Sequence, residues 1–305
     1  MAGSQTELQE FLNEEVQKYK GIAVPVRATF LNRKLVKKLG CNKLHPNPDD
    51  EFCFPDIGPN YGIINQYVSD FSRCEGDQQL ARMMNSSVAD PIIVEKIRPD
   101  GYMILNGHHR WAAALKLKLP KIRVEIVNLT QESDLKQMLK NATHSKRVTL
   151  DLDEVVLRKE RDELTEKSLG FPLNRIYQEK IRLGIPALFR FLNKKGYDIW
   201  VYSANYYSME HMQKLFFFYG SKVTGVITGT GRKGASGASL RKTMERESDQ
   251  YYRTTLHIDN DLLIRTSRDS REFDEFPLDG SSTGWSSQVM DVIGAFDKDE
   301  QPSAK

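Results

Sequence analysis

The stretch ILNGHHRWAAALKL, residues 104–117, places a strand, a sharp turn and a helix directly one after another. An apolar, strand-like run comes first, and a segment rich in Ala and Leu, which are strong helix formers, comes last. A helix N-terminus offers unpaired N–H groups and the positive end of the helix dipole, so anions bind there. The turn therefore predicts a phosphate-binding corner, with an ordinary basic surface turn as the alternative. Four residues form it: Gly107, His108, His109 and Arg110.

These residue types suit an anion for separate reasons. Gly107 has no side chain, so a ligand can approach its backbone closely. The planar guanidinium of Arg110 can offer two parallel donors to a phosphate. The ring of His109 can donate a hydrogen bond in its neutral or its charged form.

The bulk composition describes a soluble globular protein rather than a disordered or membrane protein. The chain has 305 residues, of which 39% are hydrophobic and 28% charged, and a net charge of +3. That length suits two ordinary domains, and the near-balanced charge does not point to nucleic acid or to an anionic membrane surface. No apolar run is long enough to span a bilayer, and the polar N-terminus is unlike a signal peptide. Three scattered cysteines are typical of reduced thiols, so we expect a cytoplasmic protein without membrane partners.

The order of predicted elements changes near the middle of the chain. The first half predicts an amphipathic helix over 5–19, a hairpin over 90–106 and a strand over 121–129. A polar linker helix over 130–146 follows. Beyond it, strands and helices alternate, beginning with a strand at 147–153 and a charged helix at 154–169, which indicates a doubly wound parallel α/β sheet. The last 35 or so residues show little pattern, and their end is expected to fray.

Polar side chains stand where the predicted strands of the second half end. The first of these strands ends in Asp151 and Asp153, which alternation places on the same side, and the next ends in Ser203. A third strand ends in Asp259 and Asp261. Ligands of open α/β sheets bind beyond the carboxyl ends of the strands, and clustered carboxylates suit Mg²⁺. A carboxylate beside Mg²⁺ can attack phosphorus while its neighbour protonates the leaving oxygen.

Three segments of this half, TLDLDEVV, IWVYSAN and LHIDND, resemble in that order the motifs of the haloacid dehalogenase (HAD) phosphatase superfamily. The resemblance covers roughly residues 147–297 and is closest to phosphatases that act on phosphorylated polymerase tails. Val155 is a departure, since Thr is frequent at that place. The chain between the motifs is too short for a large cap domain, which implies an open site for a macromolecular phosphate or for a substrate covered by the other domain.

The HAD resemblance also implies a role for each site residue. Asp151 would be the nucleophile, Asp153 the general acid and base, and Ser203 a ligand of the phosphoryl oxygens. The metal ion would be Mg²⁺, held by Asp259 together with the first two aspartates, and Asp261 is a further candidate ligand. The family also needs a lysine that balances the charge of the phosphate. Two candidates remain open: Lys233 and Lys242.

The hairpin and the 107–110 turn resemble the ParB/sulfiredoxin fold over roughly residues 21–129, and NKLHPNPDDEF resembles the Pro-rich first box of that family. The resemblance implies that the turn binds the phosphates of a nucleotide such as ATP, ADP or CTP. Sulfiredoxins need a cysteine here, where this chain has histidines, and a ParB partition protein would continue with a helix-turn-helix module. The GHHR form is similar to the branch that phosphorylates free serine. That branch implies a general base in the acidic box, which is Glu51 or its rivals Asp49 and Asp50, the alternative being a solvated acidic turn.

Together these features predict a phosphate-transfer enzyme of the α/β class. The expected parts are an N-terminal helix (1–20), an α+β ParB/sulfiredoxin-like nucleotide-binding domain (21–129), a linker helix (130–146), a Rossmann-like HAD domain (147–297) and a disordered tail (298–305). Its HAD domain would hydrolyse a phosphorylated small molecule, peptide or nucleic-acid end, and the first domain would bind a nucleotide and phosphorylate a small hydroxyl substrate. The alternative is a nucleotide-sensing regulatory protein with the HAD domain as scaffold or output. DNA binding is less favoured, because the basic residues of the first domain lack interleaved aromatics.

Overall fold

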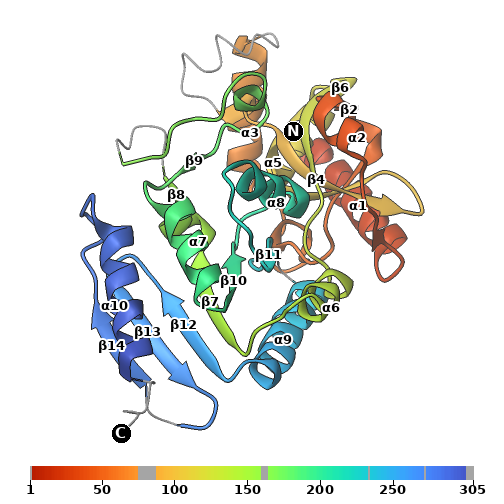
Figure 1. Cartoon of the computed structure of the whole chain (residues 1–305). Coiled ribbons are helices and arrows are strands. Elements are labelled where there is room, and N and C mark those ends of the chain that lie inside the picture. The colour runs from red at the N-terminus through yellow and green to blue at the C-terminus, as the bar shows by residue number, and fades with distance from the viewer. Residues whose placement is uncertain (1, 75–86, 159–163, 233, 271–272, 300–305) are drawn as a thin grey trace, which may run out of the picture. The chain divides into compact units, whose positions relative to one another are not determined.

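The computed structural model describes the whole chain except residues 1, 75–86, 159–163, 233, 271–272 and 300–305 (Figure 1). The chain divides into two compact units, and each combines helices with a β-sheet, as the α/β prediction requires. The N-terminal unit comprises residues 1–128 and 232–236. The C-terminal unit comprises residues 129–231 and 237–305. None of the described helices combines the length and apolar character that crossing a membrane requires.

The N-terminal unit is built on a mixed sheet. Its strands follow the order β2-β6-β4-β5-β3, and β1 adds to the free end of β4. The predicted hairpin is confirmed, since β4 and β5 pair antiparallel, and β6 pairs parallel with β4. The strands are β1 (Val24–Pro25), β2 (Lys38–Gly40), β3 (Leu44–His45), β4 (Ile92–Arg98), β5 (Tyr102–Asn106) and β6 (Lys121–Val127).

One face of this hairpin forms the core of the N-terminal unit. Val94 and Ile104 point into a cluster that includes Trp111, and all three are fully buried. Successive strand residues point to opposite faces, so the residues between them line the other face. The helices of the unit are α1 (Ala2–Tyr19), α2 (Phe30–Leu35), α3 (Tyr61–Cys74) and α5 (His108–Lys116), with short 3₁₀ turns at Cys41–Lys43, Glu51–Cys53 and Ser87–Ala89.

The sheet of the C-terminal unit has the order β11-β10-β7-β12-β13-β14. The first four strands in this order are parallel, and the last two add antiparallel at one edge (Figure 1). The strands are β7 (Lys146–Asp151), β10 (Tyr197–Tyr202), β11 (Gly225–Ile227), β12 (Thr254–Ile258), β13 (Leu262–Ser267) and β14 (Phe273–Pro277). A separate pair joins β8 (Leu157–Arg158) to β9 (Lys180–Ile181).

Five helices described in this unit surround a large apolar core. Helix α7 packs against β10 and against α10. The core includes Phe189, Trp200 and Trp285, each at most 1% exposed. The expected linker segment is mainly α6, and its Leu135 is fully buried in this same core. The helices are α6 (Glu132–Lys140), α7 (Ile185–Lys194), α8 (Met209–Phe218), α9 (Gly234–Tyr251) and α10 (Trp285–Asp299), with a 3₁₀ turn at Leu173–Arg175.

The predicted charged helix over 154–169 is wrong in the part of it that the structure describes. A single π-helical turn, Leu152–Val156, follows β7 and leads into β8 instead. Val155, Val156 and Leu157 are all buried, and the carbonyl of Val156 accepts the N–H of Arg182. A surface helix buries only one stripe of side chains, whereas these three consecutive apolar residues all need burial.

The C-terminal region has more structure than its sequence pattern predicted. It contains β14 and the helix α10, whose Val289, Ile293 and Phe296 are buried at helical spacing. Helix α10 includes residues 298 and 299 of the expected disordered tail, and residues 300–305 lie outside the described part of the chain.

Candidate functional site

The carboxyl ends of three neighbouring parallel strands meet at one edge of the C-terminal sheet. Strand β7 lies between β10 and β12, and Asp151 is its last residue. Asp151 pairs with Tyr202, directly before Ser203, and Leu150 pairs with Ile258, directly before Asp259. The predicted strand-end residues therefore lie on adjacent strands, at the edge where ligands of such sheets bind.

The chain curls around the carboxylate of Asp151 as it leaves β7. The Oδ1 atom of Asp151 accepts the backbone N–H groups of Asp153 at 2.7 Å and of Glu154 at 2.8 Å. These bonds cap the π-helical turn and fix the direction of the side chain. Asp151 is half-buried, so the carboxylate is oriented by the fold and still reaches the surface.

Asp153 is held at both of its carboxylate oxygens. The buried Ser203 donates its hydroxyl to Oδ2 at 2.6 Å, and Tyr207 donates its phenol to Oδ1 at 2.8 Å. The N–H of Asn205 donates in turn to the Ser203 hydroxyl oxygen at 2.9 Å. Burial, followed by the hydrogen bond to Asp153, raises the pKa of Tyr207, so the phenol keeps the proton that it donates.

The sequence analysis did not predict Tyr207. Its place beside Asp153 depends on the path of the irregular segment between β10 and α8, for which the letters carry no periodic signal.

The segment after β12 is tied to the segment after β7 through Asn260. The amide nitrogen of Asn260 donates to the carbonyl of Glu154 at 3.0 Å, and its amide oxygen accepts from Arg182 at 2.8 Å. The indole of Trp285 donates to the carbonyl of Asn260 at 2.8 Å. The exposed Asp259 accepts the N–H of Asn260 on Oδ1 at 2.6 Å, which orients its carboxylate.

The remaining residues proposed for this site lie in varied surroundings. The side chain of Asp261 lies close to Gly280, where an added Cβ would come within 2.6 Å of its Oδ1. Lys242 is exposed on α9. Lys233 lies outside the described residues.

The carboxylates at the strand ends are candidate ligands for magnesium. Within the described part of the chain, no group of three or more His, Cys, Asp or Glu side chains is arranged to hold a metal ion. Magnesium in phosphate-handling sites, however, usually keeps several waters and takes only one or two carboxylates plus the phosphate. Asp151 and Asp259 offer two hard oxygen donors at the ends of adjacent strands, and this donor set fits such an ion.

The 107–110 turn of the N-terminal unit has the predicted strand-to-helix form. Gly107 caps α5 with a φ of 100°, in the left-handed region that favours glycine. A Cβ at this position would lie 2.9 Å from the guanidinium of Arg110. The turn therefore requires glycine both for its backbone angles and for the space that Arg110 fills.

The three basic side chains of the turn bind other parts of the protein. His108 and His109 each accept a backbone N–H through Nε2, from Asn47 and Asn60 respectively, at 3.1 Å. Arg110 donates to the carbonyl of Asp90 at 3.0 Å and to the side chain of Asn106 at 3.2 Å. The guanidinium of Arg110, which was expected to donate two hydrogen bonds to a phosphate, thus donates to other groups of the protein instead. A phosphate at this corner would meet the backbone N–H groups of the helix start.

The acidic box lies against the 107–110 turn. Phe52 stacks on His108 at 5.3 Å between ring centroids and meets His109 edge-on at 5.0 Å. Asp50 caps the turn Glu51–Cys53 by accepting the N–H of Phe52 at 3.0 Å. Its Oδ1 also lies 3.8 Å from Nδ1 of His108. Asp50 thus has a structural role, which leaves the other two carboxylates of the box as candidates for chemistry.

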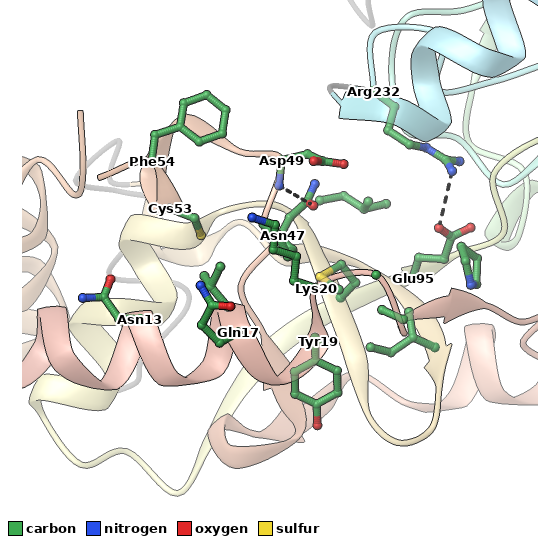
Figure 2. Close-up of a pocket in the computed structure, with 18 of the residues that line it drawn as sticks. Asn13, Gln17, Tyr19, Lys20, Asn47, Asp49, Cys53, Phe54, Glu95 and Arg232 are labelled. Atoms are coloured by element: carbon green, nitrogen blue, oxygen red, sulfur yellow. Dashed lines mark hydrogen bonds and ion pairs between the residues drawn. The ribbon is translucent and has the colours of Figure 1, made fainter. Parts of the chain in front are cut away.

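A cavity of about 1030 Å³ lies beside the acidic box (Figure 2). It is lined by side chains of α1, by the segment after β3 and by the second face of the β4–β5 hairpin. Asp49 lines it, whereas Glu51 is exposed and does not. Glu95, which is 3% exposed on β4, also lines the cavity and lies 3.9 Å from Arg232. The sequence analysis did not predict Glu95. Its position as a charged residue within an apolar strand is the feature of the sequence that could have indicated it.

The comparisons with known proteins bear on the N-terminal part of the chain. No curated protein was found to match the chain. Residues 73–143 match the family model of the ParB N-terminal domain, and this span includes β4, β5, the 107–110 turn with α5, and β6. The ParB part of the predicted resemblance is thereby confirmed for this segment, which is similar to a ParB N-terminal domain, and the acidic box at 49–51 lies outside the match.

Proposed function

We propose that the protein is a magnesium-dependent phosphomonoester hydrolase of the HAD type, with a nucleotide-binding ParB-like unit at its N-terminus. The observation that carries the proposal is the carboxylate of Asp153, held by Ser203 and Tyr207 next to the oriented carboxylate of Asp151. The strand order supports it, because the parallel strands lie third, second, first and fourth by their order in the chain. That is the order of a doubly wound sheet, and the switch point falls between β7 and β12, beside Asp151.

In the proposed reaction, a carboxylate oxygen of Asp151 forms a bond to the phosphorus of the ester. The bond from phosphorus to the leaving oxygen breaks, and Asp153 gives that oxygen a proton, so an alcohol departs. Asp153 then takes a proton from a water that attacks the aspartyl phosphate, which releases phosphate and restores Asp151. The Ser203 hydroxyl holds a phosphoryl oxygen. Bound magnesium, with Asp151 and Asp259 as ligands, would neutralise charge on the phosphoryl group.

The N-terminal unit has a separate role in this proposal. The start of α5 would hold the phosphates of ATP, ADP or CTP, and the 1030 Å³ cavity is large enough for a small substrate. Asp49 is then the residue of the acidic box best placed to accept a proton from a hydroxyl substrate in the cavity. This unit would transfer phosphate to such a substrate, and the C-terminal unit would remove phosphate.

The match to the ParB N-terminal domain also favours a second candidate function. In that case the N-terminal unit senses a nucleotide and associates with DNA, and the C-terminal unit is a scaffold or output domain. Retention on DNA that falls steeply with added salt would favour this candidate.

The deciding experiment measures phosphate release with Mg²⁺ from phosphoserine, nucleotides, phosphopeptides and 5′-phosphorylated oligonucleotides. Wild-type protein is compared with Asp151→Asn and with Asp274→Asn, which changes an exposed aspartate of β14 in the same way. We expect release by the wild type and by Asp274→Asn, and its loss in Asp151→Asn. Release that persists in Asp151→Asn, or that is absent from the wild type on every ester, would refute the hydrolase.

Binding of ATP, ADP and CTP by calorimetry tests the N-terminal unit in the same preparations. Binding without phosphate release, together with salt-sensitive retention on DNA, would favour the regulatory candidate. Absence of nucleotide binding would refute the role proposed for the start of α5.

A further inference from the structure

We propose that Tyr207 is the positioning residue that keeps Asp153 aimed at the leaving oxygen while Ser203 binds the phosphoryl group, so that Oδ2 of Asp153 is the atom that carries the proton. This inference rests on the hydrolase proposed above, and it adds a residue to that site and a division of work between the two oxygens of Asp153.

The two residues that donate hydrogen bonds to Asp153 differ in function, because only Ser203 must also bind the phosphoryl group. Ser203 donates to Oδ2 and Tyr207 to Oδ1. A serine hydroxyl has one proton and can donate it to one acceptor at a time. Ser203 therefore cannot hold Oδ2 of Asp153 and donate to a phosphoryl oxygen at once.

Arrival of the phosphoryl group changes this arrangement at one oxygen only. When Ser203 turns its proton to the phosphate, Oδ2 of Asp153 is released, takes up a proton from solvent and can give that proton to the leaving oxygen. The bond from Tyr207 to Oδ1 needs no change, so it keeps the carboxyl group from rotating. Without the phenol, Asp153 would lose its second anchor at the moment when its orientation matters for proton transfer.

The backbone that carries Tyr207 is held firmly enough for this role. The carbonyl of Ser203 accepts the N–H of Thr230 at 3.1 Å, and the carbonyl of Asn205 accepts the N–H of Gly229 at 2.9 Å. The segment from β10 to α8 is thereby fastened to the residues that follow β11. Tyr207 itself is half-buried, which restricts the ring.

The test uses Tyr207→Phe, which removes only the hydroxyl, with Tyr251→Phe as the matched control, because the Tyr251 hydroxyl donates to the carbonyl of Ala142, ahead of β7 and away from the site. Values of kcat and KM are measured with Mg²⁺ for 4-nitrophenyl phosphate, whose leaving group departs without a proton, and for phenyl and alkyl phosphates, which need one. In Tyr207→Phe we expect kcat/KM, which reports transfer of the phosphoryl group to Asp151, to fall by less than about 3-fold for the nitrophenyl ester and by roughly 30-fold or more for the others. Tyr251→Phe should keep the kinetic constants of the wild type.

Two readouts do not depend on turnover. Beryllofluoride with Mg²⁺, titrated by calorimetry, should bind Tyr207→Phe as it binds wild type, because Tyr207 contacts Asp153 and not the phosphoryl group. A crystal structure of Tyr207→Phe should show the Asp153 carboxylate displaced or in two positions. Tyr207→Gln, which returns an N–H donor, should recover part of the loss on alkyl phosphates.

The outcomes separate the two proposals. An equal loss of kcat/KM on all esters, weakened beryllofluoride binding or no loss at all would overturn the positioning role while leaving the hydrolase in place, provided that wild type is active and Asp151→Asn is not. A wild type inactive on every ester would overturn the hydrolase and the role of Tyr207 with it.

Discussion

The guanidinium of Arg182 lies over the indole ring of Trp285, with 3.8 Å from Cζ to the ring centroid. Arg182 is 2% exposed and also donates to the side chain of Asn260 at 2.8 Å and to the carbonyl of Gly280 at 2.7 Å. Asn260 in turn bonds to the carbonyl of Glu154. The stack on Trp285 thus fastens the ends of β7 and β12 to each other, and these ends carry Asp151 and Asp259.

Replacement of this arginine should destabilise the C-terminal unit. In Arg182→Met the stem still packs, but two half-buried acceptors and the cation–π contact lose their partner, so we expect the free energy of unfolding to fall by about 2–4 kcal/mol. Arg190→Met, on the exposed side of α7, is the matched control and should change it by less than about 0.5 kcal/mol. Urea denaturation measures both, and an unchanged midpoint for Arg182→Met would show that the network contributes little.

The second prediction concerns the backbone of the 107–110 turn. Gly107→Ala places a side chain at a φ of 100° and brings its Cβ within 2.9 Å of Arg110. We expect a loss of about 1–3 kcal/mol in the free energy of unfolding of the N-terminal unit. Gly62→Ala lies in α3 at an ordinary φ, and its nearest neighbour is the Asn60 side-chain oxygen at 3.1 Å, so its effect should be smaller. Equal effects of the two variants in denaturant titrations would contradict the requirement for glycine.

The third prediction concerns the pH dependence of the same turn. Burial lowers the pKa of His109 below its usual value of 6.5, with Asp50 opposing the shift. The unfolded chain therefore binds more protons than the folded one as the pH falls through 6.5, and stability is lost over that range. Above 6.5 the neutral ring accepts the N–H of Asn60, and its contribution is complete. Stability measured from pH 5 to 8 should drop less on the acid side in His109→Gln than in wild type, and parallel curves would rule His109 out as the source.

The sequence predicted strand ends far better than it predicted the residues between them. Asp151, Ser203 and Asp259 follow apolar runs, and parallel pairing of those runs is enough to bring their ends to one edge. Tyr207 reaches Asp153 only through the path of an irregular segment, which hydrophobic periodicity does not describe. Over the described residues, the charged helix predicted after Asp153 was wrong because burial of three consecutive apolar residues outweighed the charge pattern around them.

The acidic box shows that the sequence also did not predict the orientation of individual side chains. Asp49, Asp50 and Glu51 are consecutive, and sequence alone ranked Glu51 first. The short 3₁₀ turn Glu51–Cys53 uses Asp50 as its cap, leaves Glu51 exposed and leaves Asp49 on the cavity. The direction of each side chain depends on this one turn, and three consecutive acidic residues do not specify its conformation.

That arrangement leads to the last prediction, which compares Asp49→Asn with Glu51→Gln. Both variants remove one negative charge from adjacent parts of the box, so any general electrostatic effect should be shared. If the N-terminal unit transfers phosphate to a hydroxyl substrate in the cavity, Asp49→Asn should lower the rate by about 100-fold or more, as loss of a general base does. Glu51→Gln should stay within about threefold of wild type, because an exposed carboxylate outside the cavity has no path to the hydroxyl proton. The assay follows transfer of labelled phosphate from ATP, ADP or CTP to serine and related hydroxyl compounds in Asp151→Asn protein, so that the hydrolase does not remove the product. A larger loss in Glu51→Gln would restore Glu51 as the base and imply that the box changes conformation when substrate binds.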